Sequence, residues 1–465
     1  MPLQLAISRI AVGALGLLLA TPALATLRFV SPLGVDGANS CTNVLTPCAT
    51  LQHAVDVSGS GDSITVVAAV YDQRLSIVSK TNLTVNALGV TLRPDPTVLG
   101  PADVNQGSPC SGSSGRAVVL VRDSTGIVLN GLVIDGSAAF QAPSETHQLA
   151  GIFYRNASGA INGGGVIHLR TEPASSNQVA GLAILIQTGS PIPSPAPRVD
   201  ISGVTVSDYQ KSGIVFSGCD CAADGGPTGS VHTSTVTANP SDLVARNGIQ
   251  VSFGAGGVLL QQNTVVDQRF TGDPSLGLGS AVLLASSRNN QVLQNTLRDA
   301  NFGISNVGDL FCSPRAGENL SNEIRCNQIL DNDYGLTIDN NTHIIKNNDF
   351  SGNSQFAILT RSYYPPEQSD ADATFNWWGS PTGPTIASNP GGTGDPLDVR
   401  VAYRRFLVLP SICAEGDVLT VPTVSTLGLA ALALLLAVAA VLRLRRAQGP
   451  DPEGPGRPQA VLPND

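Results

Sequence analysis

The chain has an apolar run at each end and a repeating pattern of short strands between them. In the middle, β-branched residues alternate with polar ones and are punctuated by Gly, Asn, Asp and Ser, whereas long helical patterns are absent. One phrase, apolar-x-x-Asn-x-apolar, recurs at steps of 32, 32 and 21 residues. Its asparagines are Asn263, Asn295, Asn327 and Asn348. A period of this length with strand alternation predicts a solenoid of β-strands.

A second phrase, a small residue followed by apolar ones, comes 8 or 9 residues after the Asn, as at Gly303, Gly335 and Ala357. Two or three strands per repeat predict an all-β chain folded as a parallel β-helix. We expect each Asn to turn a corner in left-handed backbone and its amide to bond to the Asn of the next coil. Residues 47–55 predict a short amphipathic helix that caps the N-terminal end.

The two ends have the features of targeting segments. Residues 1–25 hold one arginine, an apolar stretch and a small-residue cleavage site ending at Ala25, which predicts a secretory signal peptide. Residues 424–442 are apolar and uncharged, and arginines follow at once. This second run predicts one membrane-spanning helix with its arginines on the cytoplasmic side. The body between the two ends is therefore expected to be exported.

These features predict the domain organisation. The parts are a signal peptide (1–25), an N-terminal cap with the first strands (26–80), the β-helix repeats (81–374), a C-terminal cap and linker (375–420), a membrane-spanning sorting or anchor segment (421–446) and a disordered cytoplasmic tail (447–465). We expect the body to be anchored in the cell envelope by this single span or sorted to the cell surface.

Composition and charge narrow the choice of partner. Only 13% of residues are charged and 49 are Gly, which argues against a coiled coil or a charged helical repeat. The formal net charge is −9, and because the two ends carry a net +2, residues 26–420 carry −11. An acidic body excludes electrostatic binding of nucleic acid. A polyanion such as pectate would be repelled unless a cation bridged the two.

All eight cysteines lie in the expected exported body, where an even count predicts disulfides. We expect Cys41 to pair with Cys48 and Cys312 with Cys326. The remaining four can pair in three ways, and they are Cys110, Cys219, Cys221 and Cys413. An alternative for two of these, Cys219 and Cys221, is a zinc fragment with His232, although a fourth ligand is not evident.

Three stretches of the body carry a resemblance to a known superfamily. They are residues 29–50, 61–71 and the closing phrase FNWWGSPTGP at 375–384. They resemble secreted bacterial right-handed β-helix proteins of the pectate-lyase-like superfamily. The resemblance implies a right-handed solenoid over most of 27–410. The superfamily includes lyases that use calcium-bound carboxylates with a basic residue, and hydrolases that use clustered aspartates.

The C-terminal run carries a second resemblance. Residues 421–429, VPTVSTLGL, resemble the start of the proteobacterial IPTL-CTERM domain, which continues as a membrane helix and then arginines. This resemblance implies a sorting signal that a protease or transpeptidase processes at the bacterial envelope.

Signatures of catalysis familiar in the superfamily are absent from the sequence. It contains no Asp-Asp pair, no Arg-x-Pro-x-x-Arg and no Asp-Pro-His. Strand alternation also predicts that one column of nearly neutral residues faces outward. The column is Phe153, Ala183, Val215, Gln250, Ser305, Thr337 and Leu359. We therefore expect these strand faces to be structural surface.

One acidic column suggests a metal site. Asp267, Asp299 and Asp331 fall on consecutive coils, so that their carboxylates would stack about 5 Å apart. Like charges at that spacing need solvation or a bridging cation, and calcium prefers such oxygen ligands. The alternative is that each Asp caps its own turn.

Few other residues offer candidate chemistry. Trp377 and Trp378 can either stack on sugar rings or seal the C-terminal end of the solenoid. Two groups are candidate catalytic sites. They are Asp208 with Tyr209 and Lys211 at one corner, and Glu145 with His147 in a loop.

The sequence therefore favours a non-catalytic binding, adhesion or structural protein displayed at the cell envelope, with carbohydrate or another surface polymer as its partner. The alternative is a polysaccharide lyase or glycoside hydrolase with a divergent site in the loops of 137–147, 170–198 and 219–230. A third class, a purely structural stalk, fits the neutral strand faces equally well. A fold alone does not choose among them.

Overall fold

The computed structural model describes residues 25–94, 115–138, 148–170, 181–189, 192–218, 225–239, 243–274, 277–308, 320–361, 369–411 and 413. No helix in these ranges has the length and apolar character that crossing a bilayer requires. The predicted span, 424–442, lies outside the described residues, and so do residues 1–24 of the predicted signal peptide.

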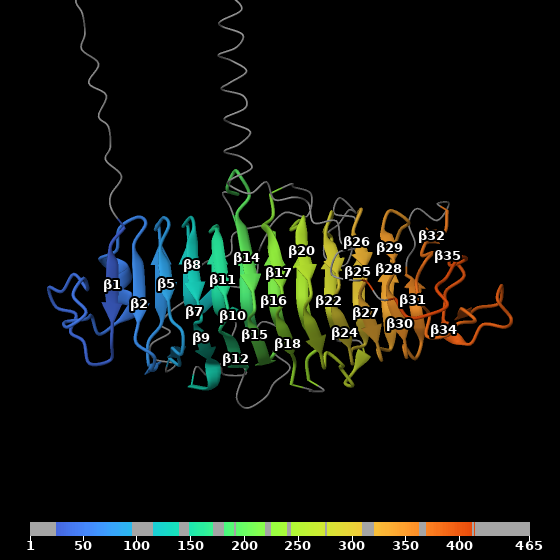
Figure 1. Ribbon diagram of the computed structural model, residues 1–465, viewed down its shortest axis with the longest axis horizontal. Helices are drawn as coiled ribbons and strands as arrows, with labels where there is room; N and C mark the ends of the chain where they lie inside the picture. Colours follow the sequence, from blue (N-terminus) through green and yellow to red (C-terminus); the bar gives the residue numbers. More distant parts are fainter. Residues whose placement is uncertain are drawn as a thin grey trace, which may run out of the picture. The chain divides into compact units, whose positions relative to one another are not determined.

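Three long sheets of parallel strands wind along this part of the chain (Figure 1). Sheet A has the order β1 (Leu27–Val30), β2 (Ser63–Val66), β5 (Thr84–Asn86), β8 (Ile127–Asn130), β11 (Gly159–Asn162), β14 (Arg198–Ser202), β17 (Thr228–His232), β20 (Val258–Gln261), β23 (Gln291–Leu293), β26 (Glu323–Arg325) and β29 (Ile344–Lys346). Sheet B has the order β3 (Val70–Tyr71), β6 (Thr91–Leu92), β9 (Val133–Asp135), β12 (Gly165–Leu169), β15 (Thr205–Tyr209), β18 (Thr235–Thr237), β21 (Thr264–Val266), β24 (Thr296–Arg298), β27 (Gln328–Leu330) and β30 (Asp349–Ser351). Sheet C has the order β4 (Leu75–Val78), β7 (Gly115–Arg122), β10 (Gln148–Arg155), β13 (Leu182–Gln187), β16 (Ser212–Ser217), β19 (Asn247–Ser252), β22 (Ser280–Ala285), β25 (Phe302–Val307), β28 (Tyr334–Ile338) and β31 (Phe356–Thr360).

Each coil takes one strand from sheet A, then one from B and one from C. The first complete coil is β2, β3 and β4, and the last is β29, β30 and β31. Two short pairs follow the last coil, β32 (Ala371–Asp372) with β35 (Val401–Ala402) and β33 (Pro384–Thr385) with β34 (Gly394–Pro396). Because equivalent strands of successive coils pair in parallel, the predicted parallel β-helix is confirmed.

A column of buried amides, here the inner ladder, runs through the corner between sheets A and B. Its rungs are Asn263, Asn295, Asn327, Asn348 and Asn376. Each Nδ2 donates to the Oδ1 of the next rung over 2.9–3.0 Å. The predicted bonding between coils is therefore confirmed, and Asn376, which lies in the closing phrase 375–384, adds a fifth rung.

The prediction that the ladder Asn itself is left-handed was wrong. Positive φ belongs to the residue before each rung, Gln262, Gln294, Cys326, Asn347 and Phe375, at 55° to 61°. That residue turns the chain, and the following Asn points its amide into the corner. From this position the amide reaches both the next rung and a backbone carbonyl, as Asn327 Nδ2 does with Asn348 Oδ1 at 2.9 Å and Val292 O at 2.7 Å.

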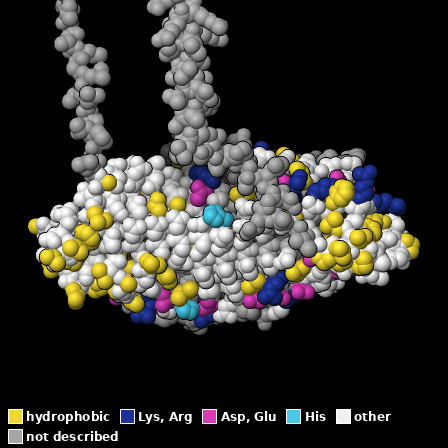
Figure 2. All heavy atoms as spheres, viewed as in Figure 1, with side chains coloured by type: hydrophobic (Ala, Val, Ile, Leu, Met, Phe, Trp, Pro, Cys, Tyr) yellow, Lys and Arg dark blue, Asp and Glu magenta, His cyan; other side chains and the backbone are white. Residues whose placement is uncertain are grey.

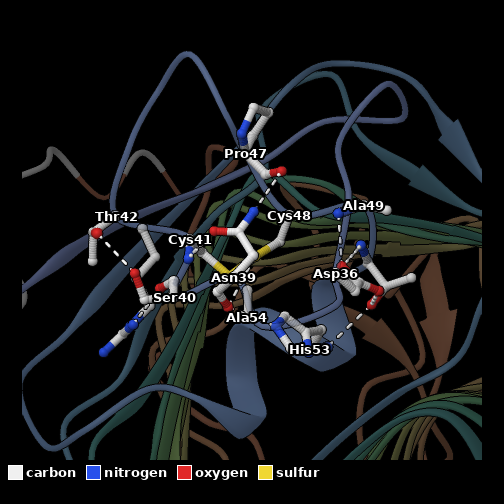
Figure 3. The surroundings of a disulfide bond; sticks show 12 residues. Asp36, Asn39, Ser40, Cys41, Thr42, Pro47, Cys48, Ala49, His53 and Ala54 are labelled. Carbon is white, nitrogen blue, oxygen red and sulfur yellow. Dashed lines mark hydrogen bonds between the residues drawn. A yellow bond between two sulfur atoms is a disulfide. The ribbon is translucent and has the colours of Figure 1, made fainter.

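The N-terminal cap is held by a short helix and a disulfide. The helix α1 (Leu51–Asp56) is shorter than the predicted span 47–55, and Thr50 caps it by accepting the His53 N–H at 3.1 Å. The predicted Cys41–Cys48 disulfide is confirmed (Figure 3). The His53 ring lies beside it, with Nε2 2.8 Å from Asn39 O. His53, Cys41 and Cys48 place potential ligand atoms together, but the two sulfurs are bonded to each other.

The other predicted disulfide requires a correction. Cys326 is disulfide-bonded, and its partner is Cys413 rather than Cys312. Cys326 turns the corner of its coil in left-handed backbone, next to the inner ladder, whereas Cys312 lies outside the described residues. The predicted zinc fragment, with Cys219 and Cys221, also lies outside them.

The outer face of sheet C differs from the expected exposed surface. Its register pairs Phe153 with Leu185 and then Val215, so Ala183 is not in this column but in the core. Leu120, Phe153, Leu185 and Val215 form a second buried apolar cluster outside the main core. Strand alternation correctly gave the direction of Phe153, but it cannot tell whether a side chain that points outward is covered.

Candidate functional site

Titratable side chains gather where the strands of sheet B end. The strands β9, β12, β15 and β18 lie side by side, and their ends carry Asp135, His168, Asp208 and Asn239. His168 and Asp208 have left-handed backbone, with φ of 57° and 51°. Such backbone is uncommon for a residue other than Gly, and it directs both side chains toward the neighbouring coils. Figure 2 shows charged side chains along this margin of the molecule.

The geometry brings these groups into one cluster, here the sheet B site: Asp135, His168, Arg170, Asp208 and Asn239. His168 Nδ1 lies 3.0 Å from Asp135 Oδ1, and its Nε2 lies 4.0 Å from Asp208 Oδ2. Asp208 Oδ1 accepts hydrogen bonds from Arg170 at 2.8 Å and Asn239 Nδ2 at 2.9 Å. The imidazole therefore lies between two carboxylates: it is hydrogen-bonded to that of Asp135 and lies beyond hydrogen-bond distance from that of Asp208.

The electrostatics of the site orient the imidazole. The pKa of Asp135 lies below its usual value, because hydrogen bonds from the Ser137 backbone N–H and the His168 ring outweigh the upward effect of burial. An ionised carboxylate only accepts hydrogen bonds, so Asp135 accepts the proton on Nδ1 and fixes the orientation of the ring. The 4.0 Å between Nε2 and Asp208 Oδ2 exceeds a hydrogen bond, so these two groups do not bond to each other directly.

Hydroxyl groups continue from this site along sheet B. Thr205, Thr235, Thr264 and Thr296 occupy the same register position on four successive strands. The first three are exposed and the fourth is partly exposed. The column continues with Gln328, whose Oε1 accepts the Thr296 hydroxyl hydrogen bond at 3.1 Å. The column from Thr205 to Gln328 is thus uncharged and rich in hydroxyls.

The predicted corner cluster is not formed as expected. Asp208 lies in the sheet B site, but Tyr209 is buried and its hydroxyl donates to Gln268 Oε1 at 2.8 Å. The Lys211 ammonium donates to Ala245 O at 2.9 Å, and burial lowers its pKa to about 8. Successive side chains of a strand point to opposite faces, which separates neighbours in sequence. The other candidates, Glu145 and His147, lie outside the described residues.

Sequence reasoning missed His168, Asp135 and Arg170. The register pairs Leu169 with Tyr209, so His168 stands one coil before Asp208 in the column that also holds Asp267. The signal was hidden because this coil turns its corner with Gly163 and Gly164 rather than with Asn. Counting four residues onward from Gly164 would have reached His168.

The predicted calcium column lies where expected along the same margin. Asp267, Asp299 and Asp331 follow β21, β24 and β27, which are neighbours in sheet B, and all three have positive φ. Asp299 Oδ2 accepts a hydrogen bond from Arg298 at 2.8 Å. Calcium binding by this column remains a prediction.

The two tryptophans are both buried at the C-terminal end. Trp378 is fully buried and stacks on Phe350 with ring centroids 5.3 Å apart. Trp377 is 8% exposed, and its Nε1 donates to Ser351 Oγ at 3.1 Å. Of the two predicted roles, sealing the end of the solenoid accords with this burial, whereas sugar stacking needs an open ring face.

Comparisons with known proteins bear on the fold. No protein-family model and no curated protein matches the chain. Among solved structures, GH136 lacto-N-biosidase from Eubacterium ramulus superposes with a TM-score of 0.51 at 15% identity, covering 74% of this chain and 66% of that one. The chain thus spans just under two thirds of that enzyme. The fold is a right-handed parallel β-helix.

Other solved structures superpose less closely. XylC in complex with xylose has a TM-score of 0.46 at 11% identity, covering 72% of this chain and 70% of that one. The tailspike protein 2 domain of bacteriophage CBA120 has a TM-score of 0.43 at 12% identity, covering 82% and 52%. At these identities the likeness concerns the fold, so function must come from the site itself.

Proposed function

We propose that this chain is a carbohydrate-binding β-helix protein of the bacterial cell envelope. The supporting observation is the sheet B site, where His168 Nε2 faces Asp208 across 4.0 Å beside exposed threonine hydroxyls. Sugar hydroxyls both donate and accept hydrogen bonds, and this site presents the His168 imidazole and the Asp208 carboxylate as polar partners for them. Solved neighbours of the same fold are named for carbohydrates, lacto-N-biose and xylose, which agrees with this class of ligand.

Substitutions at the site test the proposal. The full chain, purified in detergent, is applied to an array of plant and bacterial glycans, and the affinity for any bound glycan is then compared with that of Asp208→Asn. Loss of the carboxylate removes a charged hydrogen-bonding partner, so binding should weaken at least about tenfold. Asp200→Asn, a change of the same kind on sheet A, is the matched control. Unchanged affinity in Asp208→Asn would place binding elsewhere.

Envelope location is the second part of the proposal. Its support is the sequence: the signal peptide of residues 1–25, the apolar run 424–442 and the sorting-signal resemblance of 421–429. A sorting protease or transpeptidase would be the processing partner. Fractionation of cells that express the full chain or a chain ending at residue 420 tests it. Release of the shorter chain from the membrane fraction is expected, and equal retention of both would contradict it.

A catalytic role is the alternative, as a polysaccharide lyase or glycoside hydrolase. The observation that favours it is the contact of His168 Nδ1 with Asp135, because a base oriented by a carboxylate is a common catalytic arrangement. Asp135 and His168 come shortly before the loops 137–147 and 170–198, two of the three in which the sequence predicts a divergent site. Release of reducing ends or unsaturated uronate, measured with and without calcium, separates an enzyme from a binder. A stalk would show neither turnover nor binding.

A further inference from the structure

A second column of side-chain amides lies on the outer face of sheet A. This outer ladder consists of Ser63, Asn86, Asn130, Asn162 and Ser202. Asn130 Nδ2 donates to Asn86 Oδ1, and Asn162 Nδ2 donates to Asn130 Oδ1, both over 2.9 Å. Asn86 Nδ2 donates to Ser63 Oγ at 3.0 Å, and Ser202 Oγ donates to Asn162 Oδ1 at 2.9 Å. The three amides are therefore fixed in one orientation across consecutive coils.

Each amide of this ladder uses only part of its hydrogen-bonding capacity. An asparagine side chain has two N–H donors and two acceptor lone pairs. Among the described residues, each of the three amides donates once and accepts once. Asn86 and Asn130 are partly exposed and Asn162 is exposed, so the second donor and the second lone pair are available to a ligand.

The residues beside the ladder on β5, β8 and β11 are uncharged. Two positions earlier on β5, β8 and β11 stand Thr84, Val128 and Ala160. Figure 2 shows this face with few charged side chains over β5, β8 and β11, whereas charges gather along the margin formed by the ends of sheet B. At β14 a charged pair appears, Arg198 with Asp200 at 2.7 Å. On β5, β8 and β11 the ladder and the column beside it are thus uncharged.

We propose that this outer face of sheet A binds an uncharged repeating polysaccharide that runs across the coils. Coils repeat about every 4.8 Å, so the amides offer donors and acceptors in a regular row that a repeating polymer can match. Because the hydrogen bonds of the ladder already fix the side chains, little rotamer entropy is lost on binding. The charge of −11 over residues 26–420 disfavours a polyanion. This face belongs to sheet A and the candidate site to sheet B, so either of the two binding proposals can be wrong while the other holds.

Affinity electrophoresis tests the inference. The full chain in mild detergent is run through native gels that contain dextran, galactomannan, arabinoxylan or xyloglucan, each neutral, with polygalacturonate as the anionic comparison. At least one neutral gel should retard the wild type. Asn130→Asp replaces the donor amide with a charged acceptor at the middle rung and should weaken that retardation at least about tenfold. Asn341→Asp, the same substitution in the turn before β29, is the matched control and should behave as wild type.

A second variant separates a loss of binding from a loss of folding. Ala160→Arg places a bulky charged side chain on the same face without removing a rung, and it should also abolish retardation while the melting temperature stays near that of the wild type. Three results would each overturn the inference: no neutral gel retards the wild type, only polygalacturonate does so, or Asn130→Asp and Ala160→Arg are folded and still retarded.

Discussion

The inner and outer ladders use the same side chain in two environments. In the inner ladder, Asn327 Nδ2 donates to Asn348 Oδ1 and Val292 O, and its Oδ1 accepts from the amide and the backbone N–H of Asn295. All of its hydrogen-bonding capacity is therefore spent within the protein. In the outer ladder, Asn130 donates once and accepts once within the described residues.

The difference separates structural amides from those suited to binding. Every polar atom of a buried amide needs a hydrogen-bond partner within the protein. A polar atom without one has lost its hydrogen bonds to water, and this loss destabilises the folded state. A half-exposed amide has no such requirement and keeps a donor and an acceptor for a ligand. The repeated Asn phrase marks the inner ladder, whereas the rungs of the outer ladder share only a register position at the ends of β5, β8 and β11.

The largest expected effect is on stability, from Asn327→Ala in the inner ladder. The change leaves Val292 O and the Asn295 amide without their partner, and each unpaired buried group costs about 1–3 kcal/mol. We expect the free energy of unfolding to fall by about 3 kcal/mol or more, measured as a lower denaturant midpoint. A midpoint within error of the wild type would mean that the inner ladder does not stabilise the coils.

Acid should weaken a further buried hydrogen-bond network, which consists of Asn290, Asn322 and the titratable His343. Asn290 Nδ2 donates to Asn322 Oδ1 at 3.0 Å, the Asn322 backbone N–H donates to His343 Nδ1 at 3.3 Å, and burial lowers the pKa of His343 to about 4. The unfolded chain, with a His pKa near 6.5, binds a proton that the folded chain excludes. This contribution is complete above pH 6.5 and is lost as pH falls toward 4, by up to about 3 kcal/mol.

The measurement is the denaturant midpoint at pH 7.5, 5.5 and 4.5 for the wild type and His343→Gln. Glutamine keeps an amide in the buried network and cannot take up a proton, so the variant should lose less stability than the wild type over this range. Parallel pH profiles of the two proteins would show that His343 is not the responsible group.

A smaller effect on stability is expected in the outer ladder. Asn130→Ala removes two hydrogen bonds that water can replace, so the free energy of unfolding should fall by only about 0.5–1 kcal/mol. Differential scanning calorimetry of Asn130→Ala beside Asn327→Ala measures the contrast directly. Similar losses in both variants would remove the distinction between the ladders.

The smallest expected effect concerns calcium. If Asp267, Asp299 and Asp331 hold the ion, calcium should raise the melting temperature of the wild type by about 2 °C and EDTA should reverse the rise. Asp299→Asn should abolish the response, and Asp200→Asn on sheet A should keep it. A wild-type melting temperature that responds to neither addition would exclude the calcium column.

Much of the fold could be predicted because it repeats. The spacing of Asn263, Asn295, Asn327 and Asn348 gave the coils and the bonding between rungs, and the loop between Cys41 and Cys48 gave one disulfide. The pairing of Cys326 could not be predicted, because its partner Cys413 is 87 residues away and no local pattern links them. The candidate site was only partly predictable, since Asp208 was found but His168 and Asp135 were not.

The sequence by itself determined the features that depend on near neighbours: strand alternation, coil length, the ladder asparagines and the acidic charge of the body. The tertiary structure alone decided which side chains of successive coils meet. His168 lies between Asp135 and Asp208, 33 residues after one and 40 before the other, because parallel pairing sets His168 level with Asp208 and next to Ile167, the register partner of Asp135. Whether an outward side chain is buried, as Phe153 is, or exposed, as Asn162 is, likewise follows from tertiary packing, because strand alternation gives the direction of a side chain but not its neighbours.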